Sequence, residues 1–359
     1  MKNKEKITNY MTETSAVHWD YLIQENLTAK EAVNFLKSDM KLRTFADNLT
    51  EFYHQEDLEK RLIAGFVNDT GGKEDSIRRK VQNWMQNKNL PSGRDELFHI
   101  CFILGLDEEE SDFLLKRLDG QGIHCRDTEE LIYAYCLKCG ISYTRAKELV
   151  QELVQEELES GQEDVMTAEV REKFRLLKQE EDLLQFILEQ KSLFGKYHNT
   201  AYRYFHTMLG LLTKEGGEQW PLEDAVDCYL RLQMPSNKRT AGYSDIQKLV
   251  KKHWPGSRSI KAMKNRKQDV TRKTLLLLYL VTGGIYEESY EESDEEYVTD
   301  EEILEYHCKA MNRMLSECGM ARIDPRNAFD FLVLYSARPQ EDMFMSDRMA
   351  EVVAELYSE

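Results

Sequence analysis

Helix-start signals recur along this sequence, and they constrain its fold more than any other feature. In a capping box, a Ser, Thr or Asp side chain caps the first turn of a helix and a Glu or Gln three residues later caps back. Such pairs precede apolar runs of helical period at Thr28/Glu31, Asp107/Glu110, Asp127/Glu130, Ser244/Gln247 and Thr299/Glu302. No stretch alternates apolar and polar residues as a strand does, and no Asn-Gly or Asp-Gly pair marks a hairpin. The sequence therefore predicts an all-α fold.

Glycine and proline mark where some of these helices end or begin. Gly105 follows LFHICFIL and Gly140 follows LIYAYCLKC, where a helix commonly closes on a left-handed residue. Pro221 opens PLEDAVDCYLRL, at a position where the first turn of a helix tolerates proline. We therefore expect C-terminal caps at the two glycines and a helix start at the proline.

Composition excludes several classes of protein. The longest apolar run, Leu275 to Val281, is far short of the roughly 20 residues that span a bilayer, so we expect no membrane partner. The first residues lack the apolar core of a signal peptide. The 7 cysteines have no regular spacing and do not suggest a disulfide framework. A cytoplasmic protein of two or three domains is the resulting expectation for 359 residues.

An internal repeat suggests that part of the chain is duplicated. Residues 83–100 align with 261–278 without a gap, and the alignment continues with gaps from 114–137 to 311–337. The pairs that carry the alignment are Asn87/Asn265, Lys88/Arg266, Asn89/Lys267, Arg94/Arg272, Leu97/Leu275, Leu118/Leu315, Gly122/Gly319 and Glu130/Asp330. Because these pairs keep one order over about 75 residues, we infer a tandem duplication.

The first copy carries a recognisable order of motifs. The helix SIRRKVQNWMQN is followed by KNLPS, then RDELFHICFILGL and DEEESDFLLKRL. This order resembles the latter half of lambda-repressor-like (XRE-type) helix-turn-helix domains, in which a recognition helix ends in a tryptophan-containing turn before Pro-Ser and a helix ending at Leu-Gly. The matching residues are Val81, Trp84, Asn87, Lys88, Pro91, Ser92, Leu104, Gly105 and Leu114. Residues 122–146 also look like uncharacterised helical bacterial proteins.

The resemblance assigns physical roles to these positions. Trp84 would pack the back of the recognition helix onto the next helix. Asn87 would take the left-handed conformation that asparagine tolerates, and Pro91 would stop the turn from continuing as helix. Residues 58–75 depart from the pattern, because they lack a glutamine-led helix and contain Gly71-Gly72.

The second copy departs further, with Ala262 in place of the tryptophan and Asp269 in place of the proline. Ile260 and Met263 nevertheless have the spacing of an inward helix face. We therefore expect two related helix-turn-helix-like modules joined by a helical middle segment. The boundaries are 1–45 for a helical lead-in, 46–158 for module 1, 159–237 for the middle segment, 238–345 for module 2 with an acidic insertion at 286–302, and 346–359 for a helical tail.

Charge is distributed unevenly along the second copy. The chain has a net charge of −17, but residues 238–273 contain twelve Lys or Arg and two acids. Residues 286–305 contain eleven Asp or Glu and no Lys or Arg. Basic and amide side chains on one helix face can reach phosphates and base edges. The candidate contacts are Arg78, Arg79, Lys80, Gln82, Asn83 and Lys88 in the first copy, and Lys248, Lys251, Lys252, Arg258, Lys261, Lys264, Arg266 and Lys267 in the second.

Three interpretations of these cations stay open. They bind nucleic acid, they bind an acidic protein or the chain's own acidic insertion, or they are a solvated face without a role. We expect the first, with double-stranded DNA as the partner of a regulatory or accessory protein of bacterial type. A helical protein-interaction scaffold is the alternative, and a HEPN-like ribonuclease is the third hypothesis.

The remaining groups of His, Cys and Arg residues give little indication of a catalytic or metal site. Arg94 and His99 fit the Arg-x4-His spacing of HEPN-type ribonucleases, but the duplicated segment has Leu277 at the place of the histidine. Cys136 and Cys139, with His124 and Cys125, could hold zinc, although the first two have the spacing of core residues. We expect His198 and His206 to share one helix face with Tyr202. We expect no enzyme activity, no cofactor and no metal.

Overall fold

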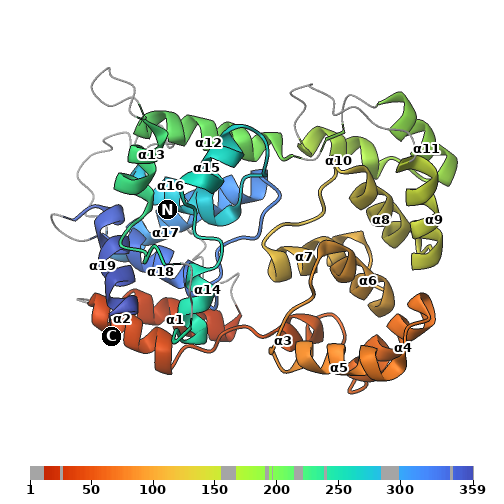
Figure 1. Ribbon diagram of the computed structural model, residues 1–359, viewed down its shortest axis with the longest axis horizontal. Coiled ribbons are helices and arrows are strands. Elements are labelled where there is room, and N and C mark those ends of the chain that lie inside the picture. Colours follow the sequence, from red (N-terminus) through yellow and green to blue (C-terminus); the bar gives the residue numbers. More distant parts are fainter. Residues whose placement is uncertain are drawn as a thin grey trace, which may run out of the picture. The chain divides into compact units, whose positions relative to one another are not determined.

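The fold is helical throughout the described residues (Figure 1). The computed structural model describes residues 12–24, 27–154, 167–190, 194–195, 197–213, 221–237, 241–283, 299–339 and 343–358. Within these ranges the chain forms helices and no strand, so the all-α prediction is confirmed. No described helix has the length and apolar character needed to cross a membrane. Of the acidic insertion predicted at 286–302, the part up to residue 298 lies outside the described residues.

The chain divides into two compact units. Unit 2 comprises 43–200 and 316–321, and unit 1 comprises the rest. Unit 2 is built from α3 (Phe45–Thr50), α4 (Leu58–Thr70), α5 (Glu74–Met85), α6 (Arg94–Leu104), α7 (Glu108–Asp119), α8 (Thr128–Cys139), α9 (Tyr143–Val154), α10 (Thr167–Arg175) and α11 (Glu180–Glu189). Unit 1 is built from α1 (Glu13–Leu22), α2 (Ala29–Ser38), α12 (Asn199–Leu212), α13 (Leu222–Ala225), the π-helical η4 (Val226–Leu230), α14 (Asp245–Lys251), α15 (Ser257–Lys264), α16 (Arg272–Val281), α17 (Asp300–Glu317), α18 (Ala328–Ala337) and α19 (Met345–Tyr357). The boundary falls within the first turn of α12 and the last turn of α17.

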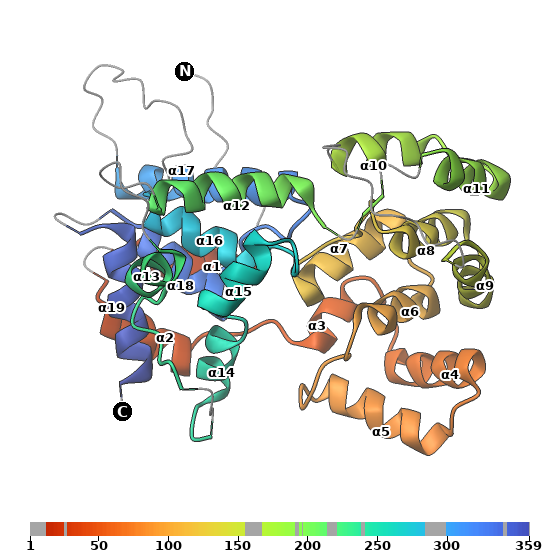
Figure 2. The ribbon, with the colours of Figure 1, turned by 45° about the horizontal axis from the view of Figure 1, so that its top comes forward.

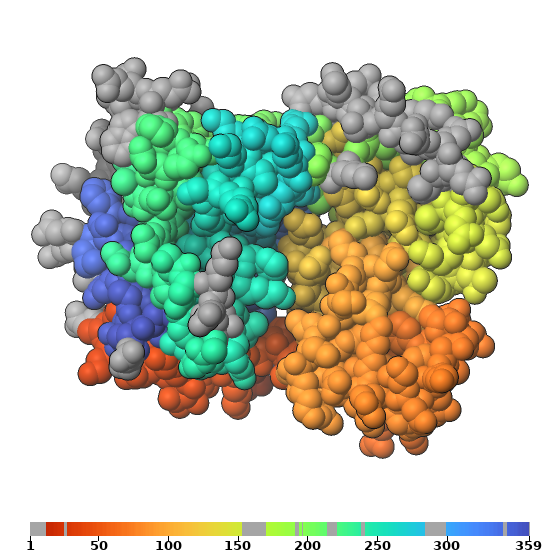
Figure 3. Space-filling model, viewed as in Figure 1, coloured from red at the N-terminus to blue at the C-terminus, as the bar shows by residue number. Residues whose placement is uncertain are grey.

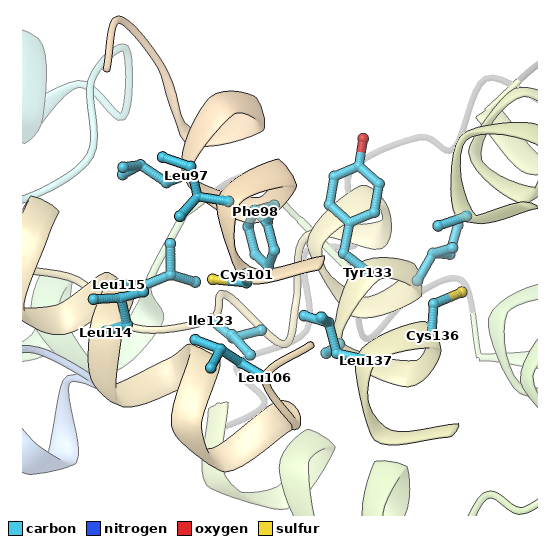
Figure 4. Close-up of a cluster of buried hydrophobic side chains, with 14 of the residues drawn as sticks. Leu97, Phe98, Cys101, Leu106, Leu114, Leu115, Ile123, Tyr133, Cys136 and Leu137 are labelled. Carbon is cyan, nitrogen blue, oxygen red and sulfur yellow. The ribbon is translucent and has the colours of Figure 1, made fainter. Parts of the chain in front are cut away.

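An apolar helix forms the centre of each unit. In unit 2, α8 is buried from Leu131 to Leu137, and α6, α7, α9 and α11 pack around it. Figure 4 shows apolar side chains of α6, α7 and α8, among them Phe98, Leu115 and Leu137, gathered in the core of this unit. In unit 1, α18 is buried along its whole length and packs against α14, α16 and α19. A helix that is apolar all round is stable only when neighbours cover every face, which places α8 and α18 at the centre.

A buried arginine–carboxylate pair is common to the two copies. Arg94, the first residue of α6, donates two hydrogen bonds to Glu130 of α8 and one to the Gly122 carbonyl (2.8 Å). Arg272, the first residue of α16, donates two hydrogen bonds of 2.7 Å to Asp330 of α18. Its guanidinium also donates to the carbonyl of residue 322 (3.2 Å). The aligned pairs Arg94/Arg272 and Glu130/Asp330 therefore make the same contact in the two units, whereas the matching carbonyls belong to residues 122 and 322 and not to the aligned Gly122 and Gly319.

The helix ends follow the predicted signals with one exception. Capping boxes form in full at Thr28, Asp107, Ser244 and Thr299. Gly105 and Gly140 adopt φ values of 72° and 66° as left-handed caps. At Asp127 only half of the box forms, because the Glu130 carboxylate accepts from Arg94 and from the His124 amide (2.8 Å) instead of capping back.

Candidate nucleic-acid interface

Helices α4 and α5 of unit 2 follow one another, joined by a short turn, and pack together. α4 ends at Gly71, which has a left-handed φ of 62°, and α5 begins at Glu74. A link of three to four residues that contains glycine is typical of this motif. The Gly71-Gly72 break expected from the sequence is present, and it lies in the turn between the two packed helices.

The inner face of α5 is anchored by its predicted residues. Trp84 is 2% exposed, and its ring contacts Phe66 of α4 (centroids 5.6 Å apart) and Phe45 of α3 (6.1 Å). These helices precede α5, whereas we expected Trp84 to pack onto the following helix. Asn87 has a φ of 52°, so the predicted left-handed conformation is confirmed. Its side-chain oxygen accepts from the Phe45 amide (3.0 Å), which adds a tie to α3.

In unit 1, α15 takes the position that α5 has in the repeat. Ile260 and Met263 of α15 are buried, as predicted from their spacing. The amide of residue 267 donates to the Ala262 carbonyl (2.8 Å), as the amide of residue 88 donates to the Asn83 carbonyl (2.9 Å). These matching bonds align the two helix ends in space.

This alignment corrects the ungapped sequence alignment by one residue. Arg266, with a φ of 50°, takes the place of Asn87, which the sequence alignment had paired with Asn265. By the same shift, Met263 instead of Ala262 takes the buried place of Trp84. The segment from the turn to the first residue of the next helix is one residue shorter in the second copy, which the ungapped alignment did not allow for.

Most of the candidate cations on α5 are neutralised. Arg78 pairs with Glu74, and Lys80 pairs with Glu96 of α6. The Lys80 ammonium also lies 5.2 Å from the centre of the Trp84 ring, and partial desolvation lowers its pKa. Among the remaining candidates, the Gln82 side chain donates to Glu59 (3.1 Å), and Asn83 is uncharged. Two of the four candidate cations in the first copy therefore form ion pairs, and Arg79 and Lys88 form none among the described residues.

The cations on α15 remain available. Arg258, Lys261 and Lys264 follow one another at intervals of three residues, are exposed, and point away from the buried face of α15. No Asp or Glu occurs between residues 246 and 268. Lys261 lies 3.4 Å from the exposed Glu223, a surface contact that contributes little. In the described part of the chain, Arg258, Lys264 and Lys267 form no ion pair. Figure 3 shows the α14–α15 segment at the surface of unit 1.

The three candidate lysines on and just after α14 differ in the contacts that their side chains make. Lys248 pairs with Asp245 (3.0 Å), and the Lys251 ammonium donates to Asn237 and lies 4.9 Å from the centre of the Tyr243 ring. Lys252 is exposed just after the helix. These side chains precede the α15 cations in the sequence.

Nothing in the sequence indicated the role of Lys273, which we counted only among the twelve Lys or Arg of residues 238–273. Its ammonium donates to the carbonyls of Val250 (2.7 Å) and Lys252 (2.6 Å) at the end of α14. Burial lowers the pKa of Lys273 to about 7. Trp254 in the same turn donates to the Leu230 carbonyl (3.0 Å), so the turn between α14 and α15 is held from two sides. The position of Lys273 beside Arg272 at a helix start gives no signal of this contact.

Arg94 and His99 do not converge on one site. Arg94 is held by Glu130 and by Asp119 (2.9 Å). His99 is 3% exposed, with its Nε2 atom 2.8 Å from Asp69 and its ring stacked on Tyr143 (3.8 Å between centroids). Residues five apart on a helix of 3.6 residues per turn point in different directions. A cavity of about 1010 Å³ beside Asp69 is lined by α4, α6 and the turn between α8 and α9, and Arg94 does not line it.

The residues of the candidate zinc site and of the predicted histidine pair also lie apart from one another. Cys125, Cys136, Cys139 and His124 do not gather at metal-ligand distances, and the Cys125 thiol faces the Ile123 carbonyl (3.8 Å). The expectation that His198 shares a helix face with His206 is wrong, because α12 begins at Asn199. The His198 ring instead meets the His124 ring edge-on, with centroids 3.7 Å apart.

No family model, no curated protein and no solved structure matches this chain. The functional argument therefore depends on the geometry and charge described above.

Proposed function

We propose that this protein binds double-stranded DNA through the basic surface of unit 1, with α15 as the helix that enters the major groove. The α15 basic surface is defined as Arg258, Lys261, Lys264, Arg266 and Lys267. A regulatory or accessory role of bacterial type, suggested by the resemblance to XRE-type domains, is part of this proposal.

The single observation that carries the proposal is the exposed cationic face of α15. The exposed Arg258, Lys264 and Lys267 form no ion pair among the described residues and have no acid within their segment, whereas Arg78 and Lys80 of α5 are paired with Glu74 and Glu96. Folding alone gives no reason to leave such a group of like charges uncompensated, because each one repels its neighbours. Phosphates of a duplex would supply the missing negative charge and release counterions.

The geometry of the α14–α15 pair also supports a duplex as the target. An α-helix fits the major groove of B-DNA, where a preceding helix can contact the backbone. The cations Lys248, Lys251 and Lys252 on α14 would serve as backbone contacts, and those on α15 as groove contacts. Because Arg78 and Lys80 of α5 are engaged in ion pairs, unit 1 would supply most of the binding energy.

The test is fluorescence anisotropy of a labelled random duplex of about 24 base pairs at about 50 and 200 mM salt. We expect affinity to fall steeply with salt, with a log–log slope of about −0.9 for each neutralised phosphate. The variant Arg258→Gln/Lys261→Gln/Lys264→Gln should make this slope shallower by about 2 to 3. The matched control Arg78→Gln/Arg79→Gln/Lys80→Gln removes three cations from α5 and should change the slope by less than about 1.

A protein-interaction scaffold gives different results in the same assay. It predicts no binding to the duplex by the intact protein at either salt concentration. It also predicts that the α15 and α5 variants are indistinguishable. Either outcome would overturn the proposal.

A further inference from the structure

Helix α12 brings aromatic and titratable side chains to the edge of the α15 basic surface. α12 lies beside α15 within unit 1 in both ribbon views (Figures 1 and 2). The Tyr202 hydroxyl donates to the Gln268 carbonyl, which fixes α12 to the turn after α15. This turn carries Arg266, so the same tyrosine that holds the backbone also lies under an interface side chain.

Arg266 is held in an unusual conformation at this contact. Its φ of 50° is left-handed, which costs an arginine about 1 kcal/mol or more relative to ordinary conformations. Its guanidinium carbon lies 4.9 Å from the centre of the Tyr202 ring, within the range of a cation–π interaction. The ring therefore orients the guanidinium above α12.

His206, one helical turn after Tyr202, completes the group. It is exposed, and the rings of Tyr202 and Phe205 lie 6.0 and 5.4 Å from its centroid. The charged groups that act on His206 are Arg266 and Lys264 of the α15 segment. Partial desolvation, followed by these two cations, lowers the pKa of His206 below its ordinary value.

From this arrangement we infer that His206, Arg266 and Lys264, supported by the Tyr202 ring, form a subsite for one backbone phosphate, and that DNA binding at this subsite takes up a proton on His206. The inference rests on the proposed function and adds α12 to the interface. A phosphate between the three side chains would neutralise the two cations that oppose protonation of the imidazole. It would also accept a hydrogen bond from the imidazolium.

The consequence is a pH-dependent affinity with a defined sign. In the free protein the lowered pKa of His206 favours the neutral form, and the bound protein would favour the charged form. Binding must therefore tighten as pH falls, since a ligand that raises a pKa is bound more strongly where the proton is available. A rise of one pKa unit on binding corresponds to a tenfold change in affinity.

The experiment measures duplex affinity by anisotropy from about pH 5.5 to 7.5 for the intact protein and three variants. The wild type should bind about three- to tenfold more tightly at the acidic end than at the neutral end. His206→Gln should lose this difference. His206→Lys keeps a positive charge throughout and should bind with a pH-independent affinity near that of the acidic wild type. His54→Gln, which replaces an exposed histidine of unit 2, should titrate like the wild type.

The outcomes separate this inference from the proposed function. Binding that is salt-dependent but has the same pH dependence in the wild type and His206→Gln overturns the α12 subsite and leaves DNA binding intact. Absence of duplex binding by the wild type at every pH overturns both. Loss of the pH dependence in His206→Gln with its retention in His54→Gln supports the subsite.

Discussion

Replacing Arg272 with methionine should destabilise unit 1 strongly. Asp330 is 2% exposed, and its two carboxylate oxygens accept bonds of 2.7 Å from the Arg272 guanidinium. Methionine retains most of the apolar stem but leaves this carboxylate buried without its cation. Removal of one partner from a buried pair typically costs about 3 to 5 kcal/mol, because the remaining charge stays desolvated. The remaining bond from the Asp324 amide (2.9 Å) would compensate only in part.

The second copy of this pair provides a matched control within the same chain. Arg94 and Glu130 are 26% and 13% exposed, so water can solvate the carboxylate when the arginine is removed. The His124 amide also remains bonded to Glu130 (2.8 Å). Arg94→Met should therefore cost less, about 1 to 3 kcal/mol, in unit 2.

Amide hydrogen exchange at increasing urea concentrations can measure the stability of the two units separately, because each amide reports the stability of the region that contains it. Amides of α16 and α18 should lose protection at lower urea in Arg272→Met, while those of α6 and α8 keep theirs. Arg94→Met should reverse the pattern with a smaller shift. A cost below about 1 kcal/mol for Arg272→Met, or a larger cost for Arg94→Met, would show that burial does not determine the energy of these pairs.

Two further substitutions test the surroundings of the α15 basic surface. The Lys273 pKa is about 7 in the native protein and near 10.5 in the unfolded chain, so stability should rise between pH 7 and 9 by up to about 1.4 kcal/mol per unit. Urea midpoints at pH 7, 8 and 9 should show this rise in the wild type and not in Lys273→Met. Arg266→Asn introduces the residue that the first copy has at this left-handed position, so thermal unfolding should show equal stability or a gain of up to about 1 kcal/mol. Duplex affinity should fall in the same variant, and an unchanged affinity would remove Arg266 from the interface.

The features that sequence could predict are those set by neighbouring residues. A capping box needs only two side chains three residues apart, and a left-handed glycine needs only the end of an apolar helix. Thr28, Asp107 and Gly140 therefore behave as predicted. Asn87 belongs to the same class, because its conformation follows from the local turn.

The features that sequence could not predict depend on partners far along the chain. The half-formed box at Asp127 results from Arg94, which lies in a different helix and attracts Glu130 more strongly than a backbone amide does. The neutralisation of Lys80 depends on Glu96, 16 residues later, and on the packing that brings α5 and α6 together. Lys273 could not be distinguished from a surface lysine, because its burial depends on the position of α14.

The contrast between the two copies indicates which of their charges folding requires. Both copies retain the arginine–carboxylate pair, because the loss of one partner alone leaves a charge that is desolvated in unit 1 and partly desolvated in unit 2. Exposed cations have no such constraint, since a substitution at the surface usually changes stability by less than about 0.5 kcal/mol. The stability of the fold therefore does not explain why the exposed cations of α5 and α15 differ in number and in ion pairing. In a chain with a net charge of −17, long-range repulsion opposes a polyanion everywhere except where cations are concentrated and unpaired. Arg258, Lys264 and Lys267 come closer to that condition than the ion-paired Arg78 and Lys80 of α5, so the proposed duplex would be expected to contact α15 in preference to α5.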